Sequence, residues 1–351
     1  MEKIAIFGTT SWGTTLALML AAKGMEVRLW ARTEKEANRL IKSGHKNSQF
    51  ANFPFPSNLL VTHRIDEAMH DVKAVIMAVP SQTMRQNITL AAPHLTKSTI
   101  IMSAAKGLEI GSGKRMSQVI AEEINPHFRD NICVCSGPNL SREILHSLPA
   151  ATVVAAEKVT VARKAQKILA TPHLCVFTNT DMVGVELGGA LKNIIALGAG
   201  IADGLAYGDN AKATFITRGL TEITALGVAL GAHPLTFSGL AGLGDVIATC
   251  ASKLSRNHYV GEELAKEERS LADITKSMTE VAEGVSTTLV AYNIAQQTEL
   301  EMPITQSIYQ VLYEGVSPRQ AAARLMGGNA RHELSGRRWR LFSIFRHSNR
   351  S

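Results

Sequence analysis

The feature that most restricts the fold is a change of hydrophobic pattern close to residue 178. Before it, short runs rich in Ile, Val and Ala alternate with amphipathic helical patterns. Strands separated by helices are typical of βαβ units, in which the strands lie parallel in one sheet. After it, long helical patterns follow one another with few strand signals. We therefore predict an α/β chain with a doubly wound, mostly parallel sheet in residues 1–178 and an all-helical domain in residues 179–332.

The individual elements follow from the same periodicity. Strands are expected at Lys3–Phe7, Glu26–Trp30, Ala74–Ala78, Thr99–Met102, Asn131–Cys135 and Ala151–Ala155. Helices are expected at Trp12–Lys23, Gln82–Ala91, Arg115–Glu123, Val183–Ala202, Ala211–Leu230, Ile274–Thr298 and Thr305–Tyr313.

The charge distribution argues against a nucleic-acid partner. The net charge is +7, but Gly336–Ser351 holds five arginines and no acid, so the remainder carries +7 − 5 = +2. The basic character therefore belongs mainly to a C-terminal tail, residues 333–351. The folded body has no basic signature of the kind that binds nucleic acid, and we expect none to bind.

Other features indicate a cytoplasmic protein. The four cysteines are too few and too scattered for a disulfide framework, so we expect buried free thiols in a reducing compartment. The N-terminus enters a strand directly, without the layout of a signal peptide. The long uncharged run at residues 223–244 contains His233, Pro234 and five glycines, so a membrane span is rejected.

A glycine-containing turn follows the first strand. Gly8-Thr-Thr-Ser-Trp-Gly13 leads into a helix, as in the dinucleotide fingerprint of Rossmann-type domains. Free amide groups and the positive end of the helix dipole can hold a pyrophosphate there. The middle glycine of the pattern is Thr10, so a purely structural turn stays an alternative. Ser11 and Trp12 either contact the cofactor or cap and pack the helix.

The end of the second strand bears on the choice of cofactor. An acidic residue is expected about 20 positions after the glycines, where it would bind the ribose hydroxyls of NAD. Arg32 occupies this zone, and a guanidinium group suits the 2′-phosphate of NADP. Glu34 is near enough to keep NAD possible. We expect NADP or NAD, with NADPH favoured.

Lys106 follows a later strand of the predicted sheet. In open α/β sheets, ligands bind beyond the carboxyl ends of the strands, so this lysine is placed to meet an anionic ligand. A solvated loop lysine is the alternative. Ser136-Gly-Pro-Asn-Leu-Ser141 follows another strand, where Gly137 and Pro138 could simply shape a turn.

Lys192 lies in an unusual helical setting. Gly188, Ile195, Ala196 and Ala199 share its face of the predicted helix Val183–Ala202. A lysine on such a face must reach water, find a partner or lose proton affinity. Burial can lower an ammonium pKa by roughly 3–5 units, into the range useful for proton transfer. The alternative is a lysine at the edge of a core helix that extends its amine to solvent.

Three further segments of the helical half carry candidate polar groups. Asp245 follows the Gly-rich turn Ala241-Gly-Leu-Gly, where it is either a helix cap or a partner of Lys192. Ser255-Arg-Asn257 combines hydroxyl, guanidinium and amide, a donor set suited to phosphate, although a surface charge cluster is the alternative. Glu283 could be an exposed helix acid.

Taken together, these segments resemble the NAD(P)-dependent glycerol-3-phosphate dehydrogenases over roughly Ile4 to Gly327. The most specific portions are Leu191–Leu205, Asn210-Ala-Lys-Ala through Arg218-Gly-Leu, Gly242-Leu-Gly-Asp and Ser255-Arg-Asn. The resemblance implies reversible reduction of dihydroxyacetone phosphate to sn-glycerol 3-phosphate, which would supply glycerophospholipid synthesis. It also implies a small phosphorylated substrate and a homodimer.

The resemblance assigns roles to residues. Lys192 is implied as the proton donor and acceptor at the C2 oxygen of the substrate. The substrate site is implied to include Lys106, Gly137, Asn139, Asp245, Ser255, Arg256 and Asn257. Cofactor contacts are implied for Gly8, Ser11, Trp12, Gly13, Arg32, Lys106, Ser141, Arg256, Val281 and Glu283. No metal is implied.

The chain departs from the family pattern at three places. The family usually reads Gly-Ala-Gly-Ser-Trp-Gly where this chain has Gly8-Thr-Thr-Ser-Trp-Gly13. Asn139 stands where Ser or Thr is commoner, and Lys106 follows Ala104-Ala105. These departures concern cofactor affinity rather than reaction class.

Two other functions stay open. A hydroxy-acid dehydrogenase of similar architecture would bind a carboxylate in place of the phosphate. A non-catalytic dinucleotide-binding regulator would be consistent with Thr10. The segment Arg337–Arg346 places Trp339, Phe342 and Phe345 at threefold spacing beside arginines, so weak contact with an anionic membrane is a further possibility. A floppy or body-docked tail is the alternative.

Overall fold

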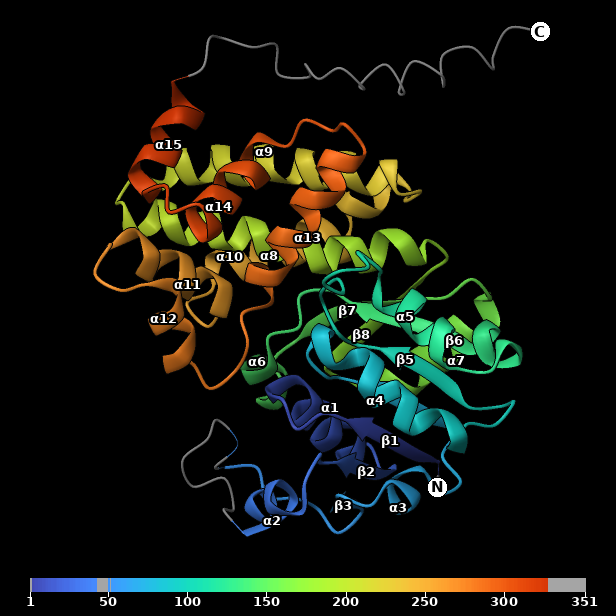
Figure 1. Cartoon of the computed structure of the whole chain (residues 1–351). Coiled ribbons are helices and arrows are strands. Elements are labelled where there is room, and N and C mark those ends of the chain that lie inside the picture. Colours follow the sequence, from blue (N-terminus) through green and yellow to red (C-terminus); the bar gives the residue numbers. More distant parts are fainter. Residues whose placement is uncertain (1, 43–49, 51, 328–351) are drawn as a thin grey trace, which may run out of the picture.

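The computed structural model describes residues 2–42, 50 and 52–327, which form a sheet half and a helical half (Figure 1). The sheet has eight strands in the order β3-β2-β1-β4-β5-β6-β7-β8. Neighbouring strands are parallel except β6 and β7. Because the chain moves outward from β1 in one direction and returns to β4 on its other side, a switch point lies between β1 and β4.

The strands and the helices of the sheet half alternate as predicted. The strands are β1 (Lys3–Phe7), β2 (Glu26–Trp30), β3 (Leu59–Thr62), β4 (Ala74–Met77), β5 (Ile100–Ser103), β6 (Ile132–Ser136), β7 (Ala150–Ala155) and β8 (Leu174–Asn179). The helices are α1 (Ser11–Ala22), α2 (Glu34–Lys42), α3 (Ile65–Met69), α4 (Met84–Ala91), α5 (Met116–Glu123), α6 (Ser141–Leu145) and α7 (Val159–Leu169), with short 3-10 turns at η1 (Ser81–Thr83), η2 (Ala92–His94) and η3 (Pro126–Asn131).

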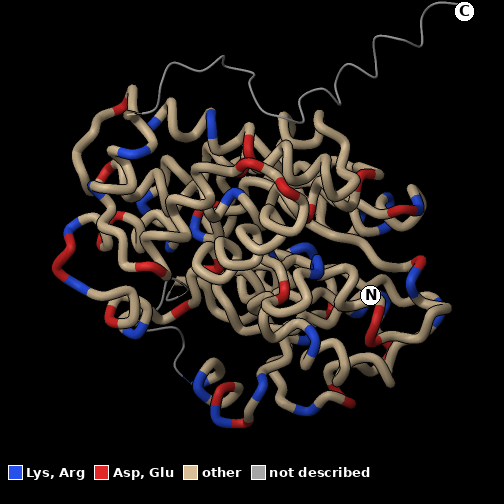
Figure 2. Tube along the Cα trace, turned by 45° about the horizontal axis from the view of Figure 1, so that its top comes forward, with Lys and Arg blue, Asp and Glu red and all other residues tan. Residues whose placement is uncertain are grey.

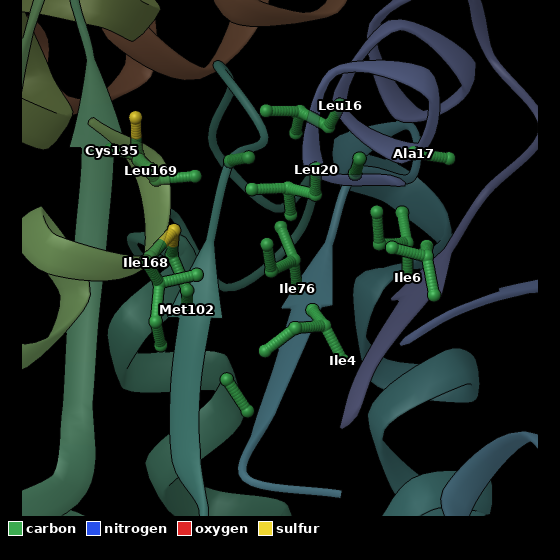
Figure 3. Packing of buried hydrophobic residues seen from close by; sticks show 14 of the residues in the cluster. Ile4, Ile6, Leu16, Ala17, Leu20, Ile76, Met102, Cys135, Ile168 and Leu169 are labelled. Carbon is green, nitrogen blue, oxygen red and sulfur yellow. The ribbon is translucent and has the colours of Figure 1, made fainter. Parts of the chain in front are cut away.

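Helices cover both faces of the sheet, which explains the apolar strands. Figure 3 shows strand residues such as Ile4 and Ile76 packed toward Leu16 and Leu20 of α1. The opposite face carries a second cluster that includes Phe7, Met77 and other side chains packed with α4 and α5. Strands buried on both faces read as nearly continuous apolar runs, and this is the pattern that the sequence contains.

The helical half is assembled around one long helix, α8 (Met182–Gly204), which is surrounded by α9, α10, α11 and α13. Its other elements are α9 (Gly208–Ala229), η4 (Pro234–Ser238), the π-helical turn η5 (Leu240–Gly244), α10 (Asp245–Ala251), α11 (Arg256–Ala265), α12 (Leu271–Ser277), α13 (Glu283–Gln297), α14 (Pro303–Tyr313) and α15 (Pro318–Met326).

Small residues let α8 lie very close to α11. A Cβ atom added at Gly261 of α11 would lie 1.9 Å from the carbonyl oxygen of Leu197, so only glycine fits there. The length and apolar composition of α8 would suffice to span a bilayer, but its apolar window is entirely buried inside the protein. The apolar character of α8 is therefore accounted for by its central position in the core.

Three predictions about the elements were wrong. Strands β3 and β8 were not expected, and β8 is an edge strand on which Cys175 is exposed rather than buried. The expected helix Ile274–Thr298 is two helices, because α12 ends at Ser277 and α13 begins at Glu283. The intervening segment reaches across to the sheet half.

Charged residues of both signs are interspersed over the described residues, as Figure 2 shows. This agrees with the small net charge that remains when the tail is set aside. The tail at 333–351 lies outside the described residues. We propose the domain boundary near residue 178, because β8 ends at Asn179 and α8 begins at Met182.

Candidate active site

Lys192 of α8 is buried, with 6% of its surface exposed. Its Nζ donates to Asp245 Oδ1 at 2.6 Å and to Thr249 Oγ1. Both partners belong to α10 and are one helical turn apart, so they present their oxygens to the same point. Asp245 is therefore a partner of Lys192, which was one of the two alternatives. Thr249 was not predicted, although its spacing of four from Asp245 was available as a signal.

The surroundings of Lys192 change its acidity. Burial lowers its pKa from 10.5 to about 8, while the Asp245 carboxylate acts in the opposite direction and Lys106 adds to the decrease. An amine with a pKa near the working pH can both donate and accept a proton at useful rates. The lysine thus has the chemistry expected of a general acid and base.

Lys106 comes from the loop after β5 and reaches the same carboxylate. Its Nζ lies 2.6 Å from Asp245 Oδ2 and 2.7 Å from the carbonyl oxygen of Gly137. One carboxylate therefore lies between two ammonium groups, one from each half of the molecule. With both lysines protonated, this cluster carries a net charge of +1, which favours an anion or a developing oxyanion beside it.

Asparagine side chains connect the cluster to the helices behind it. Asn193 donates from Nδ2 to the carbonyl oxygen of Lys106 at 3.2 Å. Asn257 donates to Asn193 Oδ1 at 2.8 Å and accepts from the Gly284 amide at 2.9 Å. The side-chain nitrogen and oxygen of Asn257 therefore both have hydrogen-bond partners within the protein. Asn193 was missed, although it stands next to Lys192 in the sequence.

The loop after β6 lies beside Lys106. Gly137 has a φ of +145°, and a Cβ there would lie 3.1 Å from the Cα of Thr152, so the position requires glycine. Asn139 donates to Thr152 Oγ1 at 3.0 Å. Its Oδ1 is buried and has no hydrogen-bond partner among the described residues. Ser141 is the first residue of α6.

The N-terminus of α1 lies at the switch point of the sheet. Gly8 has a φ of +108°, and a Cβ there would lie 2.5 Å from the carbonyl oxygen of Ala78. Thr10 is the N-cap residue of α1. Its Oγ1 accepts a hydrogen bond from the Gly13 amide at 3.1 Å and donates one to the carbonyl oxygen of Ala78 at 2.9 Å. Its hydroxyl is therefore used inside the turn.

The donors of α1 already hold an anionic group of the chain itself. The Ser11 amide and hydroxyl donate to Glu280 Oε1 at 2.7 and 2.8 Å. A carboxylate at this position occupies the place that a cofactor phosphate would take at a helix N-terminus. The residues present therefore fit a dinucleotide. Trp12 packs against the core of the sheet half, and Arg32 is exposed after β2.

The expected phosphate-binding segment is only partly available to a ligand. Ser255 is the N-cap of α11, where its side chain accepts from the His258 amide. Arg256 is half exposed, donates to the carbonyl oxygen of Val281 at 3.0 Å and pairs with Glu280 at 3.1 Å. Of the three predicted residues, Arg256 offers the most accessible donors.

Glu283 is not an exposed helix acid. Its carboxylate accepts from the Ser81 amide at 2.8 Å and from the Ser81 hydroxyl. Burial raises its pKa, while the bonds from Ser81 partly oppose that effect. Glu283 therefore joins α13 to the turn after β4, next to the switch point.

A doubly wound sheet with a glycine turn at its switch point, joined to a helical half that supplies a buried lysine, defines a Rossmann-type dinucleotide-dependent dehydrogenase. Residues 3–162 match the profile of the NAD-dependent glycerol-3-phosphate dehydrogenase N-terminus, and residues 181–323 match that of the C-terminus. The chain belongs to the NAD-dependent glycerol-3-phosphate dehydrogenase family.

Similar proteins extend over nearly the whole chain. A glycerol-3-phosphate dehydrogenase [NAD(P)+] of Dehalococcoides mccartyi is 60% identical over 348 residues, 99% of this chain and 96% of that protein. One from Citrifermentans bemidjiense is 44% identical over 95% of this chain and 99% of its own length. The crystal structure of the Coxiella burnetii glycerol-3-phosphate dehydrogenase superposes with a TM-score of 0.88 at 35% identity, covering 93% and 99% of the two chains.

Proposed function

We propose that the chain catalyses the reversible, NAD(P)H-dependent reduction of dihydroxyacetone phosphate to sn-glycerol 3-phosphate, which supplies glycerophospholipid synthesis. The observation that carries this proposal is the buried cluster in which Asp245 joins Lys192 of the helical half to Lys106 of the sheet half. The similarity to enzymes named for this activity supports it.

Lys192 acts as the proton donor in the direction of reduction. The nicotinamide, when bound, supplies a hydride to C2 of the substrate. Negative charge then develops on the C2 oxygen, and the Lys192 ammonium stabilises this charge and transfers its proton. In the reverse direction the neutral amine accepts the proton. Asp245 holds the amine in place, and Lys106 adds positive charge to the same site.

Arg256 anchors the substrate phosphate at a distance from the reacting carbon. Its guanidinium group is accessible and suits a dianion, and it lies at the first position of α11. Ser255 and Asn257 hold this segment in shape, and Gly137 and Asn139 border the Lys106 side of the site. Binding energy from the remote phosphate can then align the carbonyl carbon for reaction.

The carboxyl edge of the sheet would hold the dinucleotide. We assign its phosphates to the Gly8–Gly13 turn and the α1 N-terminus, and its 2′-phosphate to Arg32, so NADPH is favoured over NADH. The contacts of Lys106 with Gly137 and of Glu283 with Ser81 support assigning both residues to this edge. Arg256 contacts Val281 and Glu280, and Glu280 in turn binds Ser11 of α1. We also assign Trp12, Ser141 and Val281 to the cofactor site.

The test is oxidation of NADPH and NADH by the purified chain with dihydroxyacetone phosphate, beside small keto acids at equal concentration. We expect turnover of dihydroxyacetone phosphate with both nucleotides and faster turnover with NADPH. Preference for a keto acid would favour a hydroxy-acid dehydrogenase. No oxidation with any substrate, despite NADPH binding, would favour a non-catalytic regulator.

We also propose that the enzyme is a cytoplasmic homodimer whose basic tail makes weak contact with anionic membranes. Arginines beside regularly spaced aromatic residues support this assignment of the tail. Sedimentation with anionic liposomes should decrease when the chain is ended at Ser335. Equal sedimentation of the two forms would exclude the tail as the membrane contact, and analytical ultracentrifugation tests the dimer.

A further inference from the structure

Three contacts of one kind connect the two halves within the described residues. In each, a glutamate of the helical half accepts from both the backbone amide and the hydroxyl of one serine in the sheet half. Glu280 binds Ser11, Glu283 binds Ser81 and Glu186 binds Ser117. The three serines lie at or next to the first residues of α1, η1 and α5. Helix N-termini favour a carboxylate by both their free amides and their dipoles.

Two of these contacts are built into the interface. The Glu186 side chain is only 7% exposed and also pairs with Arg115. The Glu283 carboxylate lies beneath Gly107, where an added Cβ would come within 2.8 Å of it. Glu280 differs, because its side chain is 26% exposed and its other partner, Arg256, is an accessible cation.

Glu280 also differs in what it covers. Ser11 opens the helix that follows the glycine turn at the switch point of the sheet, where the proposed function places the cofactor phosphates. The Ser11 amide and hydroxyl cannot give the same hydrogen bonds to Glu280 and to a phosphate at once. A phosphate beside an undisplaced Glu280 would also meet charge repulsion.

We propose that Glu280 is an internal substitute for the cofactor phosphate: its carboxylate occupies the N-terminus of α1 until the dinucleotide binds, and binding displaces it. This inference rests on the proposed function, which assigns the dinucleotide to α1. Glu280 is thereby a residue that sets cofactor affinity, although it belongs to the helical half and lies 269 positions from Ser11 in the sequence.

The position of Glu280 in the chain suits such a displacement. It lies in the segment between the end of α12 at Ser277 and the start of α13 at Glu283, so it can move without unwinding a helix. Release of Glu280 from Arg256 also removes the carboxylate that would compete with an incoming anion for this guanidinium group. One movement therefore uncovers an amide donor for the cofactor and a cation next to it.

The experiment measures the dissociation constant of NADPH by fluorescence titration for the wild type, Glu280→Gln and Glu280→Ala. The matched control is Glu301→Gln, which makes the same charge change at an exposed position before α14. Because the cofactor phosphate no longer has to displace a carboxylate from Ser11, NADPH binding should tighten about five- to tenfold in Glu280→Ala. Glu280→Gln should tighten it less, because its amide oxygen can still accept from Ser11, and Glu301→Gln should not change it.

Two fragments of the dinucleotide test whether the gain in NADPH affinity comes from its phosphates. ADP carries a diphosphate and should bind the Glu280 variants more tightly than the wild type, whereas adenosine should bind all four proteins equally. An unchanged or weaker affinity of Glu280→Ala for NADPH and ADP, with unfolding temperatures like that of the wild type, would overturn the inference. Tighter binding of adenosine as well would also overturn it, since the effect would not come from a phosphate.

Failure of the proposed function would look different. In that case the wild type would bind neither NADPH nor ADP, or it would bind NADPH without oxidising it in the presence of dihydroxyacetone phosphate. If the wild type binds NADPH and reduces dihydroxyacetone phosphate while the Glu280 variants bind with unchanged affinity, the function stands and the displacement is wrong.

Discussion

The two halves contribute different kinds of chemical group to the same candidate site. The sheet half supplies groups at the ends of its elements, such as the Ser11 amide, the Gly137 carbonyl oxygen and the Lys106 side chain in the loop after β5. The helical half supplies Lys192 and Asp245, side chains enclosed among packed helices, and burial lowers the pKa of the lysine. Because the buried lysine is distinct from the proposed binding groups, we expect that mutation can separate ligand binding from proton transfer.

Lys192→Ala tests this separation most severely. We expect kcat to fall by about 10³- to 10⁴-fold, because both proton transfer and charge stabilisation at the C2 oxygen are lost. The dissociation constant of NADPH should change by less than about twofold, since Lys192 is not among the proposed cofactor contacts. Steady-state kinetics and fluorescence titration measure the two quantities, and substantial residual turnover would contradict the role of Lys192.

Asp245→Asn should have the next largest effect. The substitution removes the negative charge between Lys106 and Lys192, so the pKa of Lys192 should fall further below about 8. We expect a loss of kcat of about 100-fold, as is typical when the group that orients a proton donor is removed. In a pH–rate profile, the decline at high pH should move to lower pH. A profile with an unmoved decline would mean that Asp245 does not act through Lys192.

Arg256→Ala should change binding rather than chemistry. We expect the KM for dihydroxyacetone phosphate to rise about 30-fold, because a charge-assisted hydrogen bond to phosphate is lost. Arg256→Lys should recover part of this loss, since it keeps the charge but not the bidentate geometry. An unaltered KM would mean that the phosphate binds at another place.

The pH dependence of the wild-type rates tests whether Lys192 is the group that transfers the proton. Reduction requires the protonated lysine, so its rate should decrease above pH about 8, approaching tenfold per pH unit. Oxidation of glycerol 3-phosphate requires the neutral amine, so its rate should increase with pH up to the same region. Initial rates in both directions measure this, and parallel pH profiles would contradict a single group acting in both roles.

Thr10→Ala should have the smallest effect. Loss of the N-cap of α1 and of the bond to Ala78 should lower the free energy of unfolding by about 1 kcal/mol. Thr10→Ser keeps the hydroxyl and serves as the control. Denaturant unfolding compares them, and equal stability of the two variants would show that the hydroxyl contributes nothing.

Local patterns were sufficient to predict most of the sheet. The central strands are continuous apolar runs, because they are buried on both faces, and these runs were recognisable. The edge strand β8 was missed because exposed residues interrupt it. The division between α12 and α13 was also missed, since the residues between them are positioned by contacts with the sheet half rather than by helical periodicity.

In the candidate site, too, some residues could be predicted from local patterns and others could not. Lys192 could be recognised because a single lysine on an apolar helical face is unusual. Glu280 could not, because its significance comes from a serine that is 269 positions away. Contacts between residues so far apart in the sequence depend on how the two halves dock, so no local sequence pattern predicts them.

The shared carboxylate of Asp245 has a consequence for assembly. Because its two oxygens are held by lysines from opposite halves, the Lys192 amine acquires its full set of charged neighbours only when both halves have met. Fragments of the chain produced separately would each contain an incomplete charge arrangement. If turnover recovered when such fragments were mixed, the two halves would have docked correctly. Enzyme activity would therefore measure fragment complementation directly.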